Sequence, residues 1–113
     1  MTLCDDLVSL TDMLSHSREA AELMGDMSLA DLRDNRVIQL VLTRLIEIVG
    51  EAANRVSAES QQENPEIPWP QVAGMRNRLV HGYDVIDFDL LRRTIKEDLP
   101  PLIAALQGIL NQA

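Results

Sequence analysis

The sequence predicts an all-α protein, a bundle of four to five helices in a single domain that spans residues 1–113. Apolar residues recur at spacings of three and four along most of the chain, which is the period of an amphipathic helix. No segment shows the alternation of apolar and polar residues that is typical of a strand. Since the aromatic fraction is only 3%, aliphatic side chains and methionine must fill the core, which suits helix-on-helix packing.

The first helix is expected over residues 3–24, and Gly25, just past its last apolar residue, is expected to end it. Thr2 is the expected N-cap, and Asp5 favours the first turn through its negative charge. The apolar residues that define the buried stripe of this helix are Leu3, Leu7, Leu10, Leu14, Ala21 and Met24.

A second helix is expected over residues 29–56, either unbroken or interrupted near residues 34–35. Ser28 and Asp31 have the spacing of a capping box at its start. Its middle, residues 37–49, is apolar on almost every side, so it needs cover from a partner as well as from its own core. In a chain of 113 residues, a homodimer is a natural way to supply that cover.

Gly50 lies inside this long helix, where a glycine costs roughly 1 kcal/mol relative to alanine. Two explanations remain open for it. Either another helix approaches closely at Gly50, or the glycine is simply tolerated. The next residue, Glu51, either supports Arg76 or holds the long helix itself.

Residues 57–70 are expected to form a loop, because they are mostly polar and end in a run with three prolines. Trp69, the only tryptophan, is expected to anchor this loop to the core. Stacking of the indole on a nucleic-acid base is the alternative.

Proline and glycine divide the rest of the chain into three expected helices. The first covers residues 70–81, begins with Pro70 in its first turn and ends at Gly82. Asp87 is expected to cap the next one. The Pro100-Pro101 pair is expected to break that helix, and a last helix is expected over residues 102–110.

The charge balance bears on the class of partner. A net charge of −8 argues against a dedicated, nonspecific nucleic-acid binder, which usually carries a basic surface. A local basic cleft stays open, because half of the ten basic residues lie between positions 76 and 96. The single cysteine, Cys4, excludes an internal disulfide and fits a reducing compartment. With no apolar run of membrane-spanning length, we expect a cytoplasmic protein that does not engage a membrane.

The residues that carry chemistry gather in one segment, which holds Arg76, Asn77, His81 and Tyr83. If the segment is helical, Asn77 and His81 lie one turn apart beside an apolar stripe. No cysteine pair, His-x-x-x-His or zincin spacing is present, so we expect no metal and no cofactor. An arginine can hold a phosphate and stabilise charge, and a histidine can move a proton near neutral pH.

This set suits metal-free cleavage of RNA, in which the neighbouring 2′-hydroxyl attacks phosphorus. That transesterification needs both a base and an acid, whereas one chain offers only one histidine here. A two-fold dimer would bring two copies of the set together. The alternative from the residues alone is structural: Arg76 pairs with Glu47 or Glu51, and His81 caps the end of its helix.

The chain resembles the HepT-like proteins of the HEPN superfamily, toxins of prokaryotic toxin–antitoxin pairs. The HEPN motif is an arginine, a polar residue, three residues of any type and a histidine. Here Arg76, Asn77 and His81 occupy these positions, and Tyr83 matches the tyrosine that the HepT subgroup adds. The matching segments occur in order over nearly the whole chain: Gly50-Glu51-Ala52, Pro65 to Trp69, Gly74 to Tyr83, Asp87, and Asp98-Leu99-Pro100.

The resemblance implies a metal-independent ribonuclease toxin of the type VII class, working as a homodimer through its long apolar helix and its motif helix. It implies that Arg76 binds phosphate, His81 moves the proton and Asn77 orients, with both chains lining one cleft. It also implies a cognate nucleotidyltransferase antitoxin of the MNT type that transfers AMP to Tyr83. A second class of function stays open: a non-catalytic interaction module that binds nucleotide or RNA and serves as a partner's modification substrate.

Overall fold

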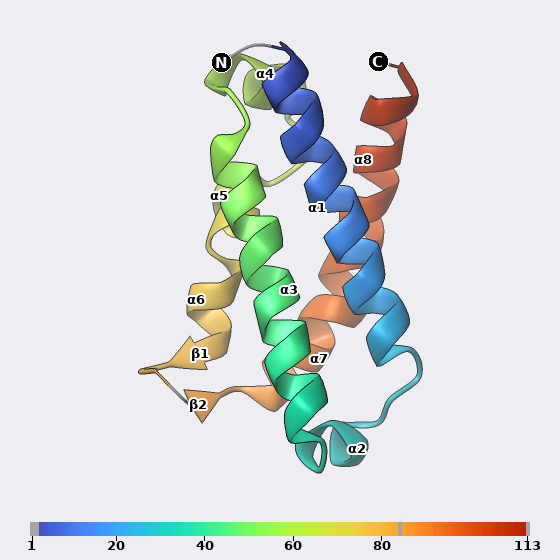
Figure 1. Ribbon diagram of the computed structural model, residues 1–113, viewed down its shortest axis with the longest axis vertical. Helices are drawn as coiled ribbons and strands as arrows, with labels where there is room; N and C mark the ends of the chain where they lie inside the picture. The colour runs from blue at the N-terminus through green and yellow to red at the C-terminus, as the bar shows by residue number, and fades with distance from the viewer. Residues whose placement is uncertain (1–2, 84, 113) are drawn as a thin grey trace.

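The structure, a computed structural model, describes residues 3–83 and 85–112. Three long helical stretches form the bundle: α1 (Leu3–Met24), α3 (Arg36–Arg55) and a C-terminal stretch that ends in α8 (Leu99–Gln112) (Figure 1). α1 packs along α3 on one side and against α8 on the other. The predicted all-α fold class is thereby confirmed. Side chains with almost no exposed surface fill the space between these helices, among them Met13, Leu42, Ile46, Val49, Leu91, Ile95, Leu99 and Leu106.

The first two predicted helix boundaries are confirmed. α1 ends at Met24, and Gly25 follows it with a φ of +49°, a conformation that favours glycine. α2 (Leu29–Arg33) begins with the predicted capping box: Ser28 Oγ accepts from the Asp31 N–H at 3.1 Å, and the Asp31 carboxylate accepts from the Ser28 N–H at 3.3 Å. The Thr2 cap lies outside the described residues.

The chain does break between α2 and α3, at Asp34 and Asn35. Asn35 starts the new helix, since its side-chain oxygen accepts from the Ile38 N–H at 3.1 Å. Gln39 then ties the two helices together by donating to the carbonyls of Leu32 and Arg33.

Gly50 is a point of close helix approach, which settles the alternative that the sequence left open. A Cβ atom at this position would lie 3.0 Å from the Ala73 carbonyl oxygen and 3.2 Å from that of Val72. Both carbonyls belong to α5 (Trp69–Ala73), which therefore crosses α3 in direct contact at Gly50. The glycine thus fixes how closely the segment after α5 can lie against α3.

The prediction of a continuous loop over residues 57–70 is wrong in its first half, where α4 (Ala58–Glu63) forms. Ser57 caps this helix by accepting from the Ser60 N–H at 3.2 Å, and the helix ends before Pro65. The predicted anchor role of Trp69 is confirmed. Its ring is buried, and its Nε1–H lies 3.1 Å from both the Gln61 and the Asn64 carbonyl oxygens.

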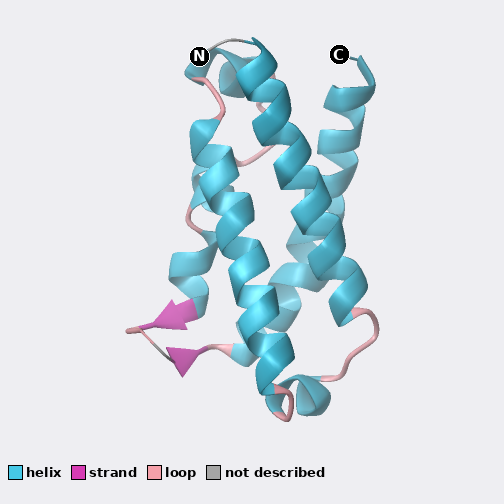
Figure 2. Cartoon of the chain, viewed as in Figure 1, coloured by secondary structure: helices cyan, strands magenta, loops and turns pink. Residues whose placement is uncertain are grey.

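The helix predicted over residues 70–81 is wrong in extent. It is divided at Gly74 into α5 and α6 (Met75–Leu79), and the chain then enters a small antiparallel hairpin of β1 (Val80–His81) and β2 (Val85–Ile86) (Figure 2). β-branched residues favour the extended pairing, and Gly82, with a φ of +70°, allows the turn. The Asp87 N–H closes the base of the hairpin by donating to the Leu79 carbonyl at 2.8 Å.

The predicted break at Pro100-Pro101 is also wrong. α7 (Phe88–Arg93) starts at its predicted cap, Asp87, and passes through a π-helical turn (Thr94–Asp98) directly into α8. A proline in a regular helix collides with the carbonyl four residues earlier. The wider π turn just before the two prolines relieves that collision, so the helix continues. None of the described helices combines the length and the apolar character that a membrane span needs.

Candidate functional site

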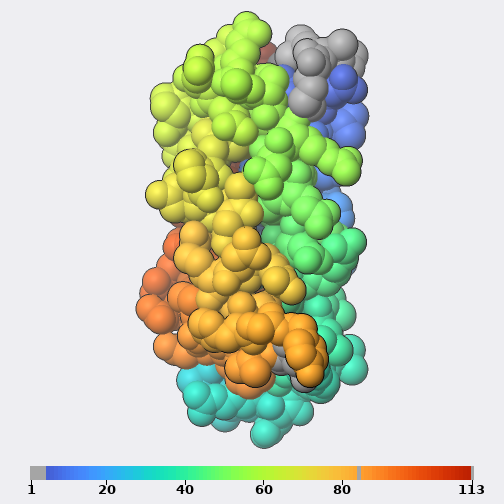
Figure 3. Space-filling model, turned by 90° about the vertical axis from the view of Figure 1, so that its left-hand side faces the viewer, coloured from blue at the N-terminus to red at the C-terminus, as the bar shows by residue number. Residues whose placement is uncertain are grey.

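The segment that carries the candidate site lies against α3 on one face of the bundle. Met75 and Leu79 of α6 are buried against the core, which leaves the polar residues of the segment on the outside. Figure 3 shows this face, with the yellow and orange segment after α4 covering much of it and green α3 beside it. The buried residues hold α6 in place, and the polar ones between them face outward.

The structure places the four predicted site residues on two elements. Arg76 and Asn77 belong to α6, with Arg76 half-buried and Asn77 exposed. His81 lies in β1, and Tyr83 lies in the turn of the hairpin with 97% of its surface exposed. The predicted helical neighbourhood of Asn77 and His81 is therefore wrong, because the helix ends at Leu79.

Arg76 has an intramolecular ionic partner. Its Nε lies 3.7 Å from Oε2 of Glu47 on α3. Of the two acids that the sequence offered, Glu47 is the one that pairs, whereas Glu51 lies 3.9 Å from Arg44. The acid therefore reaches Arg76 from the long helix, at the level where α6 packs on α3.

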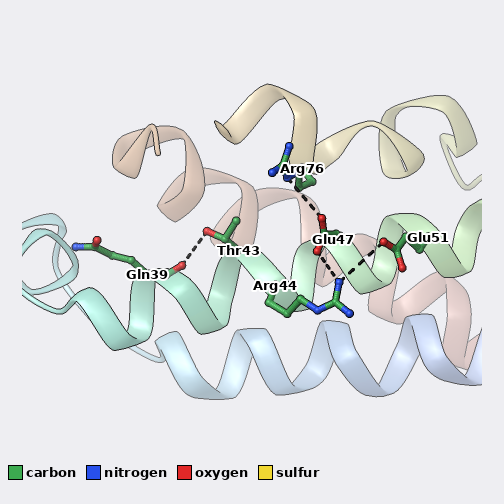
Figure 4. A network of polar contacts seen from close by, with 6 residues as sticks. All are labelled: Gln39, Thr43, Arg44, Glu47, Glu51 and Arg76. Atoms are coloured by element: carbon green, nitrogen blue, oxygen red, sulfur yellow. Dashed lines mark hydrogen bonds and ion pairs between the residues drawn. The ribbon is translucent and has the colours of Figure 1, made fainter. Parts of the chain in front are cut away.

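Glu47 also binds a second arginine. Arg44 Nη1 donates to Oε1 of Glu47 at 2.5 Å, and this hydrogen bond raises the pKa of Arg44 above its usual value. Figure 4 shows the resulting chain of alternating charges, which runs from Glu51 through Arg44 and Glu47 to Arg76. The formal charges of the four side chains cancel, so the surface around Arg76 is not strongly basic.

The His81 side chain, unlike that of Arg76, is not held by a neighbouring side chain in the described part of the chain. Among the described residues, no hydrogen-bond partner exists for the side chains of Asn77, His81 or Tyr83. A general base is usually held in one orientation by a neighbouring group. Nothing in the described part of a single chain does this for the His81 imidazole, nor does His81 cap a helix.

The candidate residues lie on an open surface. A cavity of about 420 Å³ lies between α5, α6 and α8, on another side of the motif segment, by which we mean the stretch from Arg76 to Tyr83. Its lining includes Met75 and Arg78 of α6, but neither Arg76 nor His81. The described ranges 3–83 and 85–112 hold no group of three His, Cys, Asp or Glu side chains arranged to bind a metal ion.

Residues 13–109 match the family model described as Ribonuclease HepT-like. The chain belongs to this family. The matched range contains α3, the motif segment and the hairpin, so every candidate site residue of this HepT-like chain lies inside it.

Curated relatives agree with the family. The chain is 35% identical over 95 residues to the "Probable ribonuclease HepT" of Thermococcus cleftensis, covering 80% of this chain and 86% of that protein. It is 32% identical over 93 residues to "Putative RNase MJ1380" of Methanocaldococcus jannaschii, covering 82% of this chain and 85% of the relative. The HepT-like chain has no significant match among solved structures.

Sequence reasoning missed two features of this HepT-like site. The first is Arg44, whose spacing of three and seven residues from Glu47 and Glu51 is that of neighbours on one helix face. The second is the hairpin, whose signal was a glycine turn flanked by β-branched residues. Both signals are present in the sequence, but they are short and compete with the helical period around them.

Proposed function

We propose that this HepT-like protein is a ribonuclease that cleaves RNA without a metal ion. The observation that carries the proposal is the family match together with Arg76 and His81 at the motif positions. Arg76 lies in α6 and His81 in the strand that follows this helix, on the segment whose polar residues face outward. An RNA strand can reach them there without entering an enclosed pocket.

In the proposed reaction the 2′-oxygen forms a bond to phosphorus while the bond from phosphorus to the 5′-oxygen breaks. A base takes the proton from the 2′-hydroxyl, and an acid gives a proton to the departing 5′-oxygen. Arg76 holds the phosphate and offsets the charge that builds on it. His81 moves a proton, and Asn77 donates to a phosphate oxygen or orients the histidine.

We further propose that the active form is a homodimer, because the reaction needs a base and an acid and one chain supplies a single imidazole at the site. Apolar side chains on α3 support this arrangement. Val37 is 68% exposed and Leu40 is 49% exposed, and Val41 lies on the same helix face. Covering these residues with a second copy would also bring the two motif segments toward one cleft.

The proposal extends to regulation by a nucleotidyltransferase antitoxin in a type VII toxin–antitoxin pair. Tyr83 is fully open to an approaching enzyme, and its hydroxyl has no hydrogen-bond partner among the described residues. Transfer of AMP from ATP, in which the tyrosyl oxygen bonds to the α-phosphorus, the phenol proton is lost and pyrophosphate departs, would add a phosphodiester charge and a bulky nucleoside close in sequence to His81. Both additions would oppose the binding of RNA at the same segment.

One observation favours a second candidate, a non-catalytic module that binds nucleotide or RNA. The formal charges of the four side chains in the ion-pair network around Arg76 cancel, and the chain carries a net charge of −8. A module of this kind could serve mainly as the substrate of the modifying partner. It would bind RNA without cleaving it.

Cleavage of RNA by the purified protein in excess EDTA tests the proposal. We expect wild type to cut single-stranded RNA and His81→Ala to lose the activity, while binding of a 2′-O-methyl RNA, which lacks the attacking hydroxyl, persists. His16→Ala is the matched control, because His16 lies on α1 and is bonded to the Asp12 carbonyl. Equal cleavage by wild type and His81→Ala would reject this site. Binding without cleavage by wild type would favour the non-catalytic module.

A further inference from the structure

We infer that Glu47 is a positioning residue for Arg76: it holds the base of the guanidinium from α3 and leaves the terminal nitrogens free for a phosphate. The inference rests on the proposed function, in which Arg76 binds the scissile phosphate. It assigns a role to an acidic residue outside the motif segment, on a helix that crosses beneath it.

The geometry of the contact carries the inference. An arginine offers two edges for paired hydrogen bonds, and a competing carboxylate would occupy one of them with both oxygens. Here a single oxygen of Glu47 faces Nε, at 3.7 Å. Figure 4 shows the two terminal nitrogens of Arg76 turned away from Glu47. The contact therefore orients the guanidinium without using the nitrogens that would face a substrate.

Arg44 explains why Glu47 can orient Arg76 without neutralising it. The shorter contact of Glu47 is to Arg44, at 2.5 Å, and this pair forms between residues one turn apart on α3. Arg44 thus fixes the Glu47 carboxylate and offsets its charge, so that part of the positive charge of Arg76 stays available. Glu51 touches only Arg44 in this network, at 3.9 Å.

Partial burial reduces the solvent screening of the ion pair between Glu47 and Arg76. Glu47 and Arg76 are both about one-third exposed, whereas Arg44 and Glu51 are about 60% exposed. Contacts between exposed charges are largely screened by water and salt. The half-buried pair is screened less, and α6 is held against α3 by Met75 and Leu79, so the separation of the two backbones is fixed.

The kinetic test compares Glu47→Ala, Glu47→Gln and Glu51→Gln. Loss of the orienting contact should lower kcat roughly 10- to 100-fold in Glu47→Ala with a small change in KM, because misplacement acts on the transition state. Glu47→Gln keeps a polar oxygen of the same reach beside Nε, so it should retain more activity than Glu47→Ala. Glu51→Gln removes the same charge one turn away and should stay within about threefold of wild type.

Two kinetic results would overturn the inference. A kcat of Glu47→Ala equal to that of Glu51→Gln would show that Arg76 needs no support from α3. A rise in kcat/KM, through a lower KM, would show that Glu47 competes with the phosphate instead of positioning the arginine. Thermal unfolding and the oligomeric state of each variant separate these effects from loss of the fold.

A second measurement separates this inference from the proposed function. The Nε–Hε signal of Arg76 in a ¹⁵N spectrum reports the surroundings of Nε, including the Glu47 carboxylate at 3.7 Å, without RNA. It should move to the position of a free arginine in Glu47→Ala and stay in place in Glu51→Gln; an unmoved signal in Glu47→Ala would overturn the inference. If wild type cuts no RNA, the proposed function fails, and this spectrum still decides whether Glu47 holds Arg76.

Discussion

The hydroxyl of Ser60 donates a hydrogen bond of 2.6 Å to Oδ2 of Asp6, across 54 positions of the chain. Ser57 adds two more hydrogen bonds to the same carboxylate, from its N–H at 2.9 Å and from its hydroxyl at 2.7 Å. Asp6 is buried, and these three donors lower the pKa of its carboxyl below the usual 3.8. The contacts join the start of α1 to α4 at the end of the bundle where both termini lie (Figure 1).

The lowered pKa predicts a loss of stability in acid. A carboxyl whose pKa is depressed in the folded state contributes stability above its unfolded pKa, here near 3.8, and loses it as the pH falls through the folded value. Asp6→Asn should lower the free energy of unfolding by roughly 1–3 kcal/mol at pH 7 and flatten its decline below about pH 4. Denaturant unfolding across pH measures both, with Asp12→Asn, an exposed acid on the same helix, as control. If the free energy of unfolding of Asp6→Asn fell below pH 4 as steeply as that of wild type, this account would be contradicted.

Gly50→Ala tests the close approach of α5 to α3. The added methyl would meet two backbone carbonyl oxygens at 3.0 and 3.2 Å, and neither can move without shifting α5. We expect a loss of roughly 1–3 kcal/mol from overpacking, larger than the helix-propensity gain of about 1 kcal/mol.

Gly108→Ala is the matched control for that variant, because the added methyl in α8 would meet no atom within 4 Å apart from its chain neighbours and the local backbone of its own helix. It should gain about 0.5–1 kcal/mol in chemical denaturation. Equal stabilisation by both substitutions would show that α5 and α3 are not in contact at Gly50.

Arg76→Lys should lower RNA cleavage about tenfold or more, since an ammonium group cannot reproduce the planar fork that holds a phosphate. Arg78→Lys is the comparison, because Arg78 faces the cavity beside α8 and donates to the Gln71 carbonyl. Its cleavage rate should stay near that of wild type. A similar loss of cleavage rate in the two variants would indicate that both arginines of α6 contribute, and that Arg76 has no special role.

Tyr83→Phe should abolish AMP transfer while leaving the fold and RNA cleavage intact, because the hydroxyl has no partner among the described residues. Intact mass after co-expression with the antitoxin measures the transfer, and melting temperature checks the fold. An AMP adduct on Tyr83→Phe would place the acceptor on another residue.

Leu40→Glu should weaken the proposed dimer, because a buried charge opposite its own copy is costly to desolvate. Val8→Glu places the same charge on α1, where the valine is 62% exposed, and should leave assembly unchanged. Sedimentation at several concentrations compares the two. If the Leu40 variant associates like wild type, the exposed face of α3 is not the contact between copies.

Local signals were enough to predict much of the fold. The stripe of α1, the capping box at Ser28 and the cap at Asp87 each involve residues a few positions apart, so sequence spacing determines them. Two errors depended on packing against other elements. The proline pair predicted a break where the π turn lets the helix continue, and helix periodicity extended the motif helix past its true end at Leu79. The candidate residues were found from the motif, whereas the choice of Glu47 over Glu51 required the placement of α6 on α3.

The spacing between Arg76 and His81 has a structural origin that a helix repeat would not give. Leu79 ends the helix, Val80 turns its side chain into the protein, and His81, the next residue of the strand, faces the opposite way. Because side chains alternate along a strand, adding or removing one residue between Leu79 and His81 would point the imidazole inward. The number of residues between the end of α6 and the histidine therefore decides on which face of the strand the imidazole lies. A chain with one more residue there would contain the same arginine and histidine, but its histidine side chain would be buried.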